Sequence, residues 1–276
     1  MIDKQLSIVI PVYNGAKYID IALQSIGFID HNEIEVIVID DKSTDETLNH
    51  CEKYLIYNNF VLIKHDRRMG VSAARNSGII SSTASYLAFL DCDDQLLYGS
   101  ISNWLSAIKK DNKWDLHLWG CKVLNGEESK SFCTKKDQIM TKESYIGEMF
   151  WNDFTRTVRY GVLWGKIYKK SVIIDNGLLF DESTDLGEDT WFNIDFYGYM
   201  NNACIHSEIS YLHICHTDSL SNQVCSNYSE ILDITEKKYE QLFRSVGKKR
   251  YSLFLIKKHF EAIYRKHQRE VLFRKE

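Results

Sequence analysis

The chain has 276 residues and a formal net charge of −4 at pH 7. Hydrophobic residues make up 44% and charged residues 26%, a globular composition that excludes a disordered, collagen-like or coiled-coil chain. The charge is uneven, because residues 248–276 hold 10 Lys and Arg against 3 Asp and Glu, a net +7, so the rest of the chain carries −11. Such a basic segment either binds an anionic surface or forms a solvated helix face, and the sequence leaves both open.

The sequence predicts no membrane span and no export signal. It contains no run of about 18 apolar residues, and Met1-Ile2-Asp3-Lys4 lacks the basic start and apolar run of a signal peptide. The 7 cysteines are odd in number and include no Cys-x-x-Cys pair, so neither a zinc site nor a disulfide framework is predicted. We therefore expect a cytoplasmic protein with reduced thiols.

The first hundred residues alternate between two kinds of pattern. Apolar, β-branched runs predict buried strands, and each of the first three is followed by a segment with helical spacing or small residues. The expected strands are 6–12, 35–39, 60–63 and 86–90, and the expected helices are 16–26, 43–55 and 70–80. The second helix is expected to start with a capping box made by Ser43 and Glu46. The alternation predicts an α/β fold, doubly wound around a parallel sheet.

The second half of the sequence is less regular. Helices are expected over 100–110, 188–199 and 226–247, strands over 116–123 and 203–215, and a polar surface loop over 125–140. From residue 248 an amphipathic basic helix is expected, with apolar residues at Leu253, Ile256, Phe260, Ile263 and Val271. No repeat or low-complexity linker is present, so we expect one compact domain with a helical tail.

Acidic residues follow two of the predicted strands. Asp91-Cys92-Asp93-Asp94 places three carboxylates within four residues, a costly arrangement unless a cation neutralises them. Asp-x-Asp supplies the hard oxygen ligands that Mg²⁺ and Mn²⁺ prefer, although a solvated acidic turn is the simpler alternative. The pair Asp40-Asp41 could accept hydrogen bonds from a base or a ribose. Both groups lie at the carboxyl ends of strands, where open α/β sheets bind ligands.

Three further segments carry candidate groups. Gly70-Val-Ser-Ala-Ala-Arg-Asn76 puts Arg75 at a helix start that favours anions, and it matches neither a dinucleotide-binding glycine motif nor a P-loop. Asp189 opens a helix, where a carboxylate is either a cap or a general base. The histidines of residues 211–221 either bind metal or phosphate, or are simply hydrogen-bonded in a strand.

Together, and in this order, these motifs resemble the inverting family 2 glycosyltransferases of the GT-A fold. The resemblance covers about residues 5–222. Besides the segments above, it rests on Ser7-Ile-Val-Ile-Pro-Val-Tyr-Asn14, Val38-Ile-Asp-Asp-Lys-Ser-Thr-Asp45, Trp164-Gly-Lys-Ile-Tyr168, Phe180-Asp-Glu182 and Gly187-Glu-Asp189. It implies a Rossmann-like nucleotide-binding half with a mixed central sheet. The expected division is a domain over 1–225, with a nucleotide-sugar half (1–100) and an acceptor half (101–225), and a helical basic extension over 226–276.

The resemblance also implies roles for single residues. Asp189 would be the base that deprotonates the acceptor hydroxyl. A Mn²⁺ or Mg²⁺ ion would be held by Asp93 and Asp91, with His213 as a rival ligand. The donor would be bound by four groups of residues, which line the base pocket, contact the uracil or ribose, contact the diphosphate and close over the diphosphate. These residues are Pro11, Tyr13, Asp40, Asp41, Arg75, Asp91, Cys92, Asp93, His216, Ser219 and Ser221.

The implied activity is metal-dependent, inverting transfer of one sugar from a nucleotide-sugar, UDP-linked in the first place, to a hydroxyl of a glycan. The expected acceptor is a lipid-linked O-antigen or capsule repeat; a protein or teichoic acid acceptor, and a non-catalytic sugar-nucleotide-binding protein, are the alternatives. The Gln-x-x-Arg-Trp motif of processive members is absent, which favours single-sugar transfer. We expect no nucleic-acid partner and a cytoplasmic location, with the anionic inner face of the membrane as a candidate surface. Pairing of two copies of the chain is left open.

Overall fold

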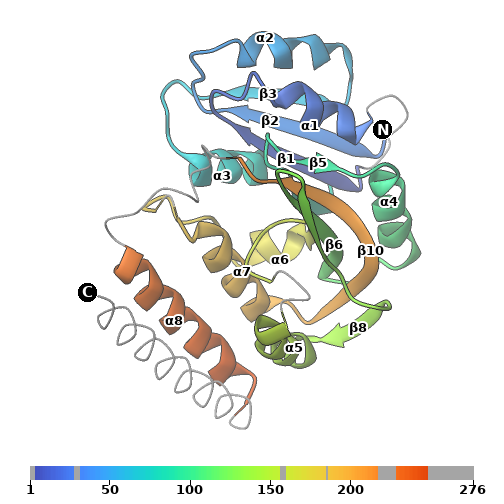
Figure 1. Cartoon of the computed structure of the whole chain (residues 1–276), viewed down its shortest axis with the longest axis vertical. Helices are drawn as coiled ribbons and strands as arrows, with labels where there is room; N and C mark the ends of the chain where they lie inside the picture. The colour runs from blue at the N-terminus through green and yellow to red at the C-terminus, as the bar shows by residue number, and fades with distance from the viewer. Residues whose placement is uncertain (1–3, 28–31, 156–159, 185, 217–227, 248–276) are drawn as a thin grey trace.

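The computed structural model describes residues 4–27, 32–155, 160–184, 186–216 and 228–247 (Figure 1). The strands are β1 (Leu6–Val12), β2 (Ile34–Asp40), β3 (Phe60–Lys64), β4 (Tyr86–Phe89), β5 (Gln95–Leu96), β6 (Leu116–Asn125), β7 (Glu128–Phe132), β8 (Gln138–Thr141), β9 (Lys166–Lys169) and β10 (Asn202–Ile214). The helices are α1 (Ile19–Ile26), α2 (Thr47–Glu52), the 3-10 turn η2 (Lys53–Ile56), α3 (Val71–Ser81), α4 (Ser100–Lys110), α5 (Lys142–Thr155), α6 (Lys170–Asp175), α7 (Glu188–Tyr199) and α8 (Tyr228–Ser245).

The strands form one mixed sheet in the order β3-β2-β1-β4-β9-β6-β10-β5, with β7 paired to β6 and β8 to β10. The first four strands are parallel, which confirms the doubly wound half expected from the alternating pattern. The strand order reverses at β1, which has β2 on one side and β4 on the other. In an open α/β sheet, ligands bind outside the carboxyl ends of the strands at such a switch point.

Helices cover both faces of the parallel half because its strands are apolar on both sides (Figure 1). On β1, Ile8 and Ile10 pack in one cluster with residues of α1, while Val9 packs in another with residues of α3. The small residues of α3 allow a close approach, since a Cβ on Gly78 would lie 2.2 Å from a methyl group of Val9. This packing holds the start of α3 near the ends of β1 and β2.

The surface loop expected over 125–140 is wrong. β6 continues to Asn125, β7 pairs with it in antiparallel fashion, and β8 pairs with β10. Four of the five β7 residues are exposed and only Phe132 is buried, so the hairpin is held mainly by main-chain hydrogen bonds. A strand that buries almost no side chain leaves no apolar alternation in the sequence.

The capping box is also wrong, and the helix after β2 starts later than expected, at Thr47. Ser43 Oγ accepts a hydrogen bond from the Asn14 backbone N–H at 2.9 Å, and the Thr47 N–H donates to Asp45 Oδ1 at 3.1 Å. Ser43 thus joins the loop after β2 to the loop after β1, and Asp45 performs the helix-start role. The two loops that border the candidate site are therefore linked.

Helix α8 confirms the helix expected over 226–247. Its side chains pack on α7: Trp191 Nε1 donates to Thr235 Oγ1 at 2.7 Å, and Leu242 and Phe243 are buried in the core. The amphipathic basic helix expected from residue 248 lies outside the described residues. None of the helices in the described part of the chain has the length and apolar character needed to cross a membrane.

Candidate active site

The ends of β1 and β2 present the residues expected around the base. Pro11 is buried in β1, whereas Tyr13 follows the strand end and is 37% exposed, with the Arg68 guanidinium 4.2 Å from its ring centre. Asp40 ends β2 and is buried; its Oδ2 accepts from the Ser43 N–H at 3.1 Å, and its Oδ1 has no hydrogen-bond partner among the described residues. A buried carboxylate oxygen without a partner is costly, so this atom is a ready acceptor for a ligand N–H or O–H.

Asp41, unlike Asp40, has both carboxylate oxygens hydrogen-bonded within the protein. Its carboxylate accepts hydrogen bonds from the backbone N–H groups of Met69 and Gly70, both at 2.8 Å, and from His65 Nδ1 at 2.8 Å. Gly70 stands at φ 93°, a left-handed conformation that favours glycine, directly before α3. Asp41 therefore fixes the approach to α3, which accounts for its burial; a contact with the donor stays a prediction.

The turn after β4 is anchored by its last carboxylate, Asp94. This side chain is fully buried and accepts hydrogen bonds from the Tyr211 hydroxyl at 2.8 Å, His213 Nδ1 at 3.0 Å and the Ile214 N–H at 2.9 Å. All three donors belong to β10. Asp94 thus joins the Asp-x-Asp turn to the strand that carries the candidate histidines, and it leaves Asp91 and Asp93 on the open side.

Arg75 lies at the centre of a buried ion-pair network. Its Nη2 donates to Asp91 Oδ1 at 3.0 Å, and its Nη1 donates to Glu188 Oε1 at 2.9 Å and Asp189 Oδ1 at 2.8 Å. The Arg75 side chain is only 4% exposed, while those of Asp91 and Asp189 are 27% and 22% exposed. The guanidinium therefore brings together the Asp-x-Asp turn and the first turn of α7. Its expected contact with the base and diphosphate stays a prediction.

The charges of this network oppose the cost of burial. Burial by itself lowers the pKa of Arg75, but the carboxylates of Asp189, Asp91 and Glu188 outweigh it and hold that pKa above its ordinary value. Burial raises the pKa of Asp189 well above its ordinary value, and Arg75 opposes this shift. Arg75 thus stays charged, and Asp189 becomes a more basic carboxylate than an exposed aspartate, as a proton acceptor requires.

Asp93 and His216 approach each other at the other end of the turn. His216 Nε2 lies 4.0 Å from Asp93 Oδ2, and the His216 ring is 4.5 Å from the Tyr18 ring, just before α1. Burial, together with the carboxylates of Asp91 and Asp94, raises the pKa of Asp93 to about 6. Cys92, which lies between Asp91 and Asp93 in the sequence, is half-buried. Its Sγ lies 3.3 Å from the point where a Cβ on Gly15 would stand. The surplus of negative charge at Asp93 favours a bound cation.

His213 contacts both Asp94 and Trp164. The Trp164 indole stacks on the His213 ring at 3.7 Å, and its Nε1 donates to Asp91 Oδ2 at 3.4 Å. Both carboxylate oxygens of Asp91 therefore have protein donors. Trp164 and Glu188 are site residues to which the sequence assigned no role, although both lie within the quoted motifs. Ser219 and Ser221 lie outside the described residues.

Comparisons with known proteins agree with this fold. A solved structure of Staphylococcus aureus TarS in complex with UDP-GlcNAc superposes with a TM-score of 0.73 at 23% identity, covering 86% of this chain and 70% of that one. The likeness confirms the expected GT-A fold.

Curated relatives cover most of this chain. A GalNAc(5)-diNAcBac-PP-undecaprenol β-1,3-glucosyltransferase of Campylobacter jejuni is 26% identical over 70% of this chain and 56% of its own length. A poly(ribitol-phosphate) β-N-acetylglucosaminyltransferase, TarP of S. aureus, is 28% identical over 82% and 67%. The glycosyltransferase EpsJ of Bacillus subtilis, itself uncharacterised, is 24% identical over 78% of this chain and 62% of its own length. The alignments thus cover between 56% and 67% of the length of these three relatives. Residues 7–171 match the model of glycosyl transferase family 2, and the chain belongs to that family.

Proposed function

We propose that the chain transfers one sugar from a UDP-sugar to a hydroxyl of a glycan acceptor, with inversion at the anomeric carbon. The observation that carries this proposal is the Arg75 network, which joins Asp91 of the Asp-x-Asp turn to Asp189 at the start of α7. It couples a donor-binding segment and a candidate base at the switch point of the sheet. The UDP and UDP-GlcNAc complexes of TarS, a structural neighbour, support the choice of donor.

For the donor, we assign the base or ribose contact to Asp40 rather than to Asp41. The Oδ1 atom of Asp40 has no hydrogen-bond partner in the described part of the chain, whereas the Asp41 carboxylate accepts from two backbone N–H groups and His65. Tyr13, exposed at the end of β1, supplies a flat ring on the same edge of the sheet.

For the metal, the residues present fit Mn²⁺ or Mg²⁺. Asp93 supplies a hard oxygen ligand, and His216 offers an imidazole nitrogen 4.0 Å from that carboxylate. Asp91 is paired with Arg75 and Trp164, and the Nδ1 atom of His213 with Asp94, so we rank Asp93 and His216 ahead of Asp91 and His213 as ligands. When bound, the ion supplies Lewis-acid stabilisation of the charge that develops on the leaving diphosphate.

For the acceptor, Asp189 takes the proton as the hydroxyl attacks. Arg75 contacts its Oδ1 at 2.8 Å and so fixes the direction of the carboxylate, while Asn193 Nδ2 donates to the Asp189 carbonyl at 2.8 Å and fixes the helix turn. A single displacement with the base on the acceptor side inverts the anomeric centre, so an α-linked donor gives a β-linked product.

The proposed acceptor is a lipid-linked glycan, supported by the similarity to the undecaprenol-linked glucosyltransferase of C. jejuni. A teichoic acid polymer is the second candidate, because TarP acts on poly(ribitol-phosphate). We further propose that residues 248–276, with a net charge of +7, bind the anionic membrane face where a lipid-linked acceptor is presented. The rival is that this segment packs on the protein or on a second copy.

The test of function is UDP release. The purified full chain is incubated with Mn²⁺ and a panel of UDP-sugars, alone and with lipid-linked glycans or poly(ribitol-phosphate). We expect slow donor hydrolysis with one sugar and faster UDP release with one acceptor class. Binding of UDP without turnover on any acceptor would favour a non-catalytic binding protein, and absence of UDP binding would refute the proposal. Vesicle sedimentation of the full chain and of a chain ending at Gly247 tests the membrane step.

A further inference from the structure

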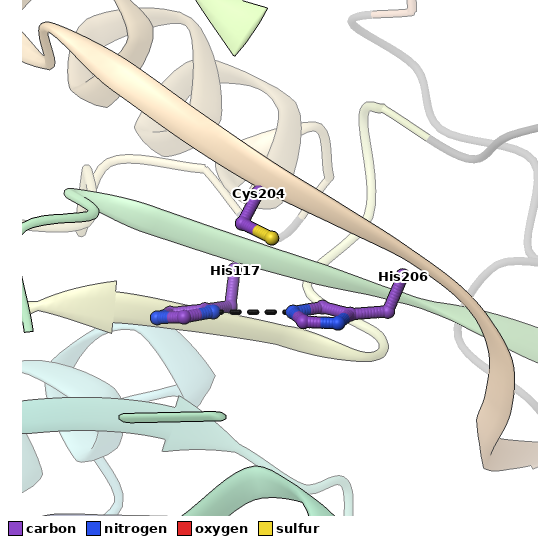
Figure 2. A group of neighbouring side chains, drawn as sticks. All are labelled: His117, Cys204 and His206. Atoms are coloured by element: carbon purple, nitrogen blue, oxygen red, sulfur yellow. Dashed lines mark hydrogen bonds between the residues drawn. The ribbon is translucent and has the colours of Figure 1, made fainter. Parts of the chain in front are cut away.

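Three metal-ligating side chains meet outside the Arg75 network. His117 lies on β6, and Cys204 and His206 lie on β10 (Figure 2). Their candidate ligand atoms all lie within 4.8 Å of one another, and His117 Nδ1 faces His206 Nε2 at 3.1 Å. Two imidazole nitrogens and a thiol in this arrangement resemble a set of zinc ligands.

The register of β6 and β10 explains why these side chains meet. Cys204 pairs with His117 in the parallel ladder, so the two side chains point to the same face of the sheet. After Ile205 the register shifts, and residues 206–208 stand opposite the single residue Trp119. His206, two residues after Cys204 in the same strand, is expected on that face by the alternation of side chains, and its Nε2 lies 3.1 Å from His117 Nδ1 beside the register shift.

Trp119 fixes the orientation of both imidazoles. Its ring stacks on His206 with ring centres 3.8 Å apart and an interplanar angle of 10°, and it lies 5.5 Å from His117 at 23°. The planes of the two imidazoles are nearly parallel, with an interplanar angle of 13°. The rings are therefore held in place without an ion, which reduces the entropic cost of binding one.

Asp137 lies near the ring nitrogen of His206 that faces away from His117. Its Oδ2 lies 3.9 Å from His206 Nδ1, and its Oδ1 accepts hydrogen bonds from the Ser207 N–H at 2.8 Å and hydroxyl at 2.7 Å. At 3.9 Å the contact with His206 is electrostatic rather than a hydrogen bond, and it lies on the Nδ1 side of the ring. The other ring nitrogen is Nε2, the atom that faces His117.

Burial also affects the three side chains, independently of the contacts that bring them together. It lowers the pKa of His117 to about 3 and that of His206 to about 4. Burial raises the pKa of Cys204 to about 11, so a metal ion would have to displace the thiol proton. His117 Nε2, the ring nitrogen that does not face His206, is buried without a hydrogen-bond partner among the described residues.

We propose that His117, Cys204 and His206 form a metal site for Zn²⁺, with water as the fourth ligand. A small pocket of about 10 Å³ lies beside His206 and is also lined by Trp119 and Cys133, although neither His117 nor Cys204 lines it. Imidazole and thiolate ligands select zinc over the Mg²⁺ or Mn²⁺ assigned to the carboxylates of the donor site. The ion would join β6 to β10 across the register shift. The spacing of the cysteines along the sequence predicts no such site, because the ligands come from two distant strands.

The test uses the metal-free full chain titrated with Co²⁺, whose thiolate charge-transfer band in the near ultraviolet reports a cobalt–sulfur bond. We expect one equivalent of Co²⁺ to produce the band and Zn²⁺ to abolish it. The band should be absent in Cys204→Ser. It should persist in Cys215→Ser, which removes an exposed thiol next to the donor-site histidines, and in Asp93→Asn, which removes a donor-site carboxylate.

Two further variants keep the test decisive if Cys204→Ser does not fold. His206→Gln should weaken Zn²⁺ binding at least about 100-fold, the loss of a ligand, and Asp137→Asn should weaken it by a smaller factor, because its contact with His206 is electrostatic only. Calorimetric Zn²⁺ affinities measure both. The proposal is overturned if the wild-type chain gives no band, if the band survives in Cys204→Ser, or if both His206→Gln and Asp137→Asn bind Zn²⁺ as tightly as the wild type. A band that disappears in Cys215→Ser or Asp93→Asn would place the ion at the donor site instead.

Discussion

The carboxylate of Asp189 lies 2.8 Å from Nη1 of Arg75, and Arg75 itself is almost completely buried. The candidate base is therefore not an isolated carboxylate. It is one of three carboxylates that form ion pairs with the same guanidinium. Because Arg75 also contacts Asp91, one side chain joins the Asp-x-Asp turn to the candidate base. Arg75 acts as a positioning residue for both.

Removal of Arg75 should destabilise the protein strongly. Arg75→Met leaves three carboxylates without their cation, and breaking a buried ion pair typically costs about 3–5 kcal/mol in the free energy of unfolding. Urea unfolding measures the loss. The matched control is Lys238→Met, which removes the partly exposed ion pair between Lys238 and Asp195 at 2.6 Å and should cost less than about 1 kcal/mol. Equal losses in the two variants would contradict the central role of Arg75.

Asp189→Asn should separate binding from transfer. The amide oxygen keeps a hydrogen bond from Arg75, but the side chain no longer accepts a proton. We expect UDP affinity within about threefold of the wild type and transfer reduced by about 10²–10⁴-fold, the usual contribution of a general base. Calorimetry with UDP and an assay of sugar transfer give the two values. If UDP affinity falls as far as transfer does, Asp189 is a donor ligand or a structural residue; if transfer survives, Glu188→Gln becomes the test of the neighbouring carboxylate.

Loss of Asp93 should abolish the proposed metal dependence of donor turnover. Asp93→Ala removes a proposed metal ligand, and we expect metal-dependent UDP release to fall at least about 100-fold. Even changes to residues that contact the ligands from behind lower metal affinity or activity about 10–100-fold. The measurement is UDP release with Mn²⁺ and with EDTA. Asp66→Ala, at an exposed aspartate, is the control and should behave as the wild type. Full wild-type activity in EDTA would remove the metal from the mechanism.

The sequence predicts the parallel half of the fold well because β1, β2 and β4 are continuous buried apolar runs. Polar residues directly after such strands predict where the site lies. The partners of Arg75 could not be derived from local patterns, since Glu188 and Asp189 are more than 100 residues away and their helix is also explained by ordinary capping. For the same reason β7 was not predicted: main-chain pairing with β6, rather than side-chain burial, determines it.

Glu35 is expected to make stability depend on pH. This buried carboxylate accepts hydrogen bonds from the Ser7 hydroxyl at 2.5 Å, the Thr83 hydroxyl at 2.8 Å and the Ala84 N–H at 3.2 Å. Burial by itself raises the pKa of Glu35, but these hydrogen bonds outweigh it and hold the pKa below its ordinary value of 4.5. A lowered pKa means that the folded state favours the charged form. The contribution is therefore complete above pH 4.5 and is lost as the pH falls through the folded-state pKa.

Glu35→Gln should be less stable than the wild type at pH 7 by about 1.5–3 kcal/mol, the range for hydrogen bonds to a charged group. The difference should shrink as the pH falls below 4.5, because the wild-type carboxylate then loses its charge as well. Urea unfolding at a series of pH values measures both curves. Glu33→Gln is the matched control, since the Glu33 side chain forms a partly exposed ion pair with Lys109, and its loss should cost less than about 1 kcal/mol at pH 7. A Glu35→Gln difference that is constant from pH 7 to the acid limit would show that the charge of Glu35 contributes nothing and that only its shape matters.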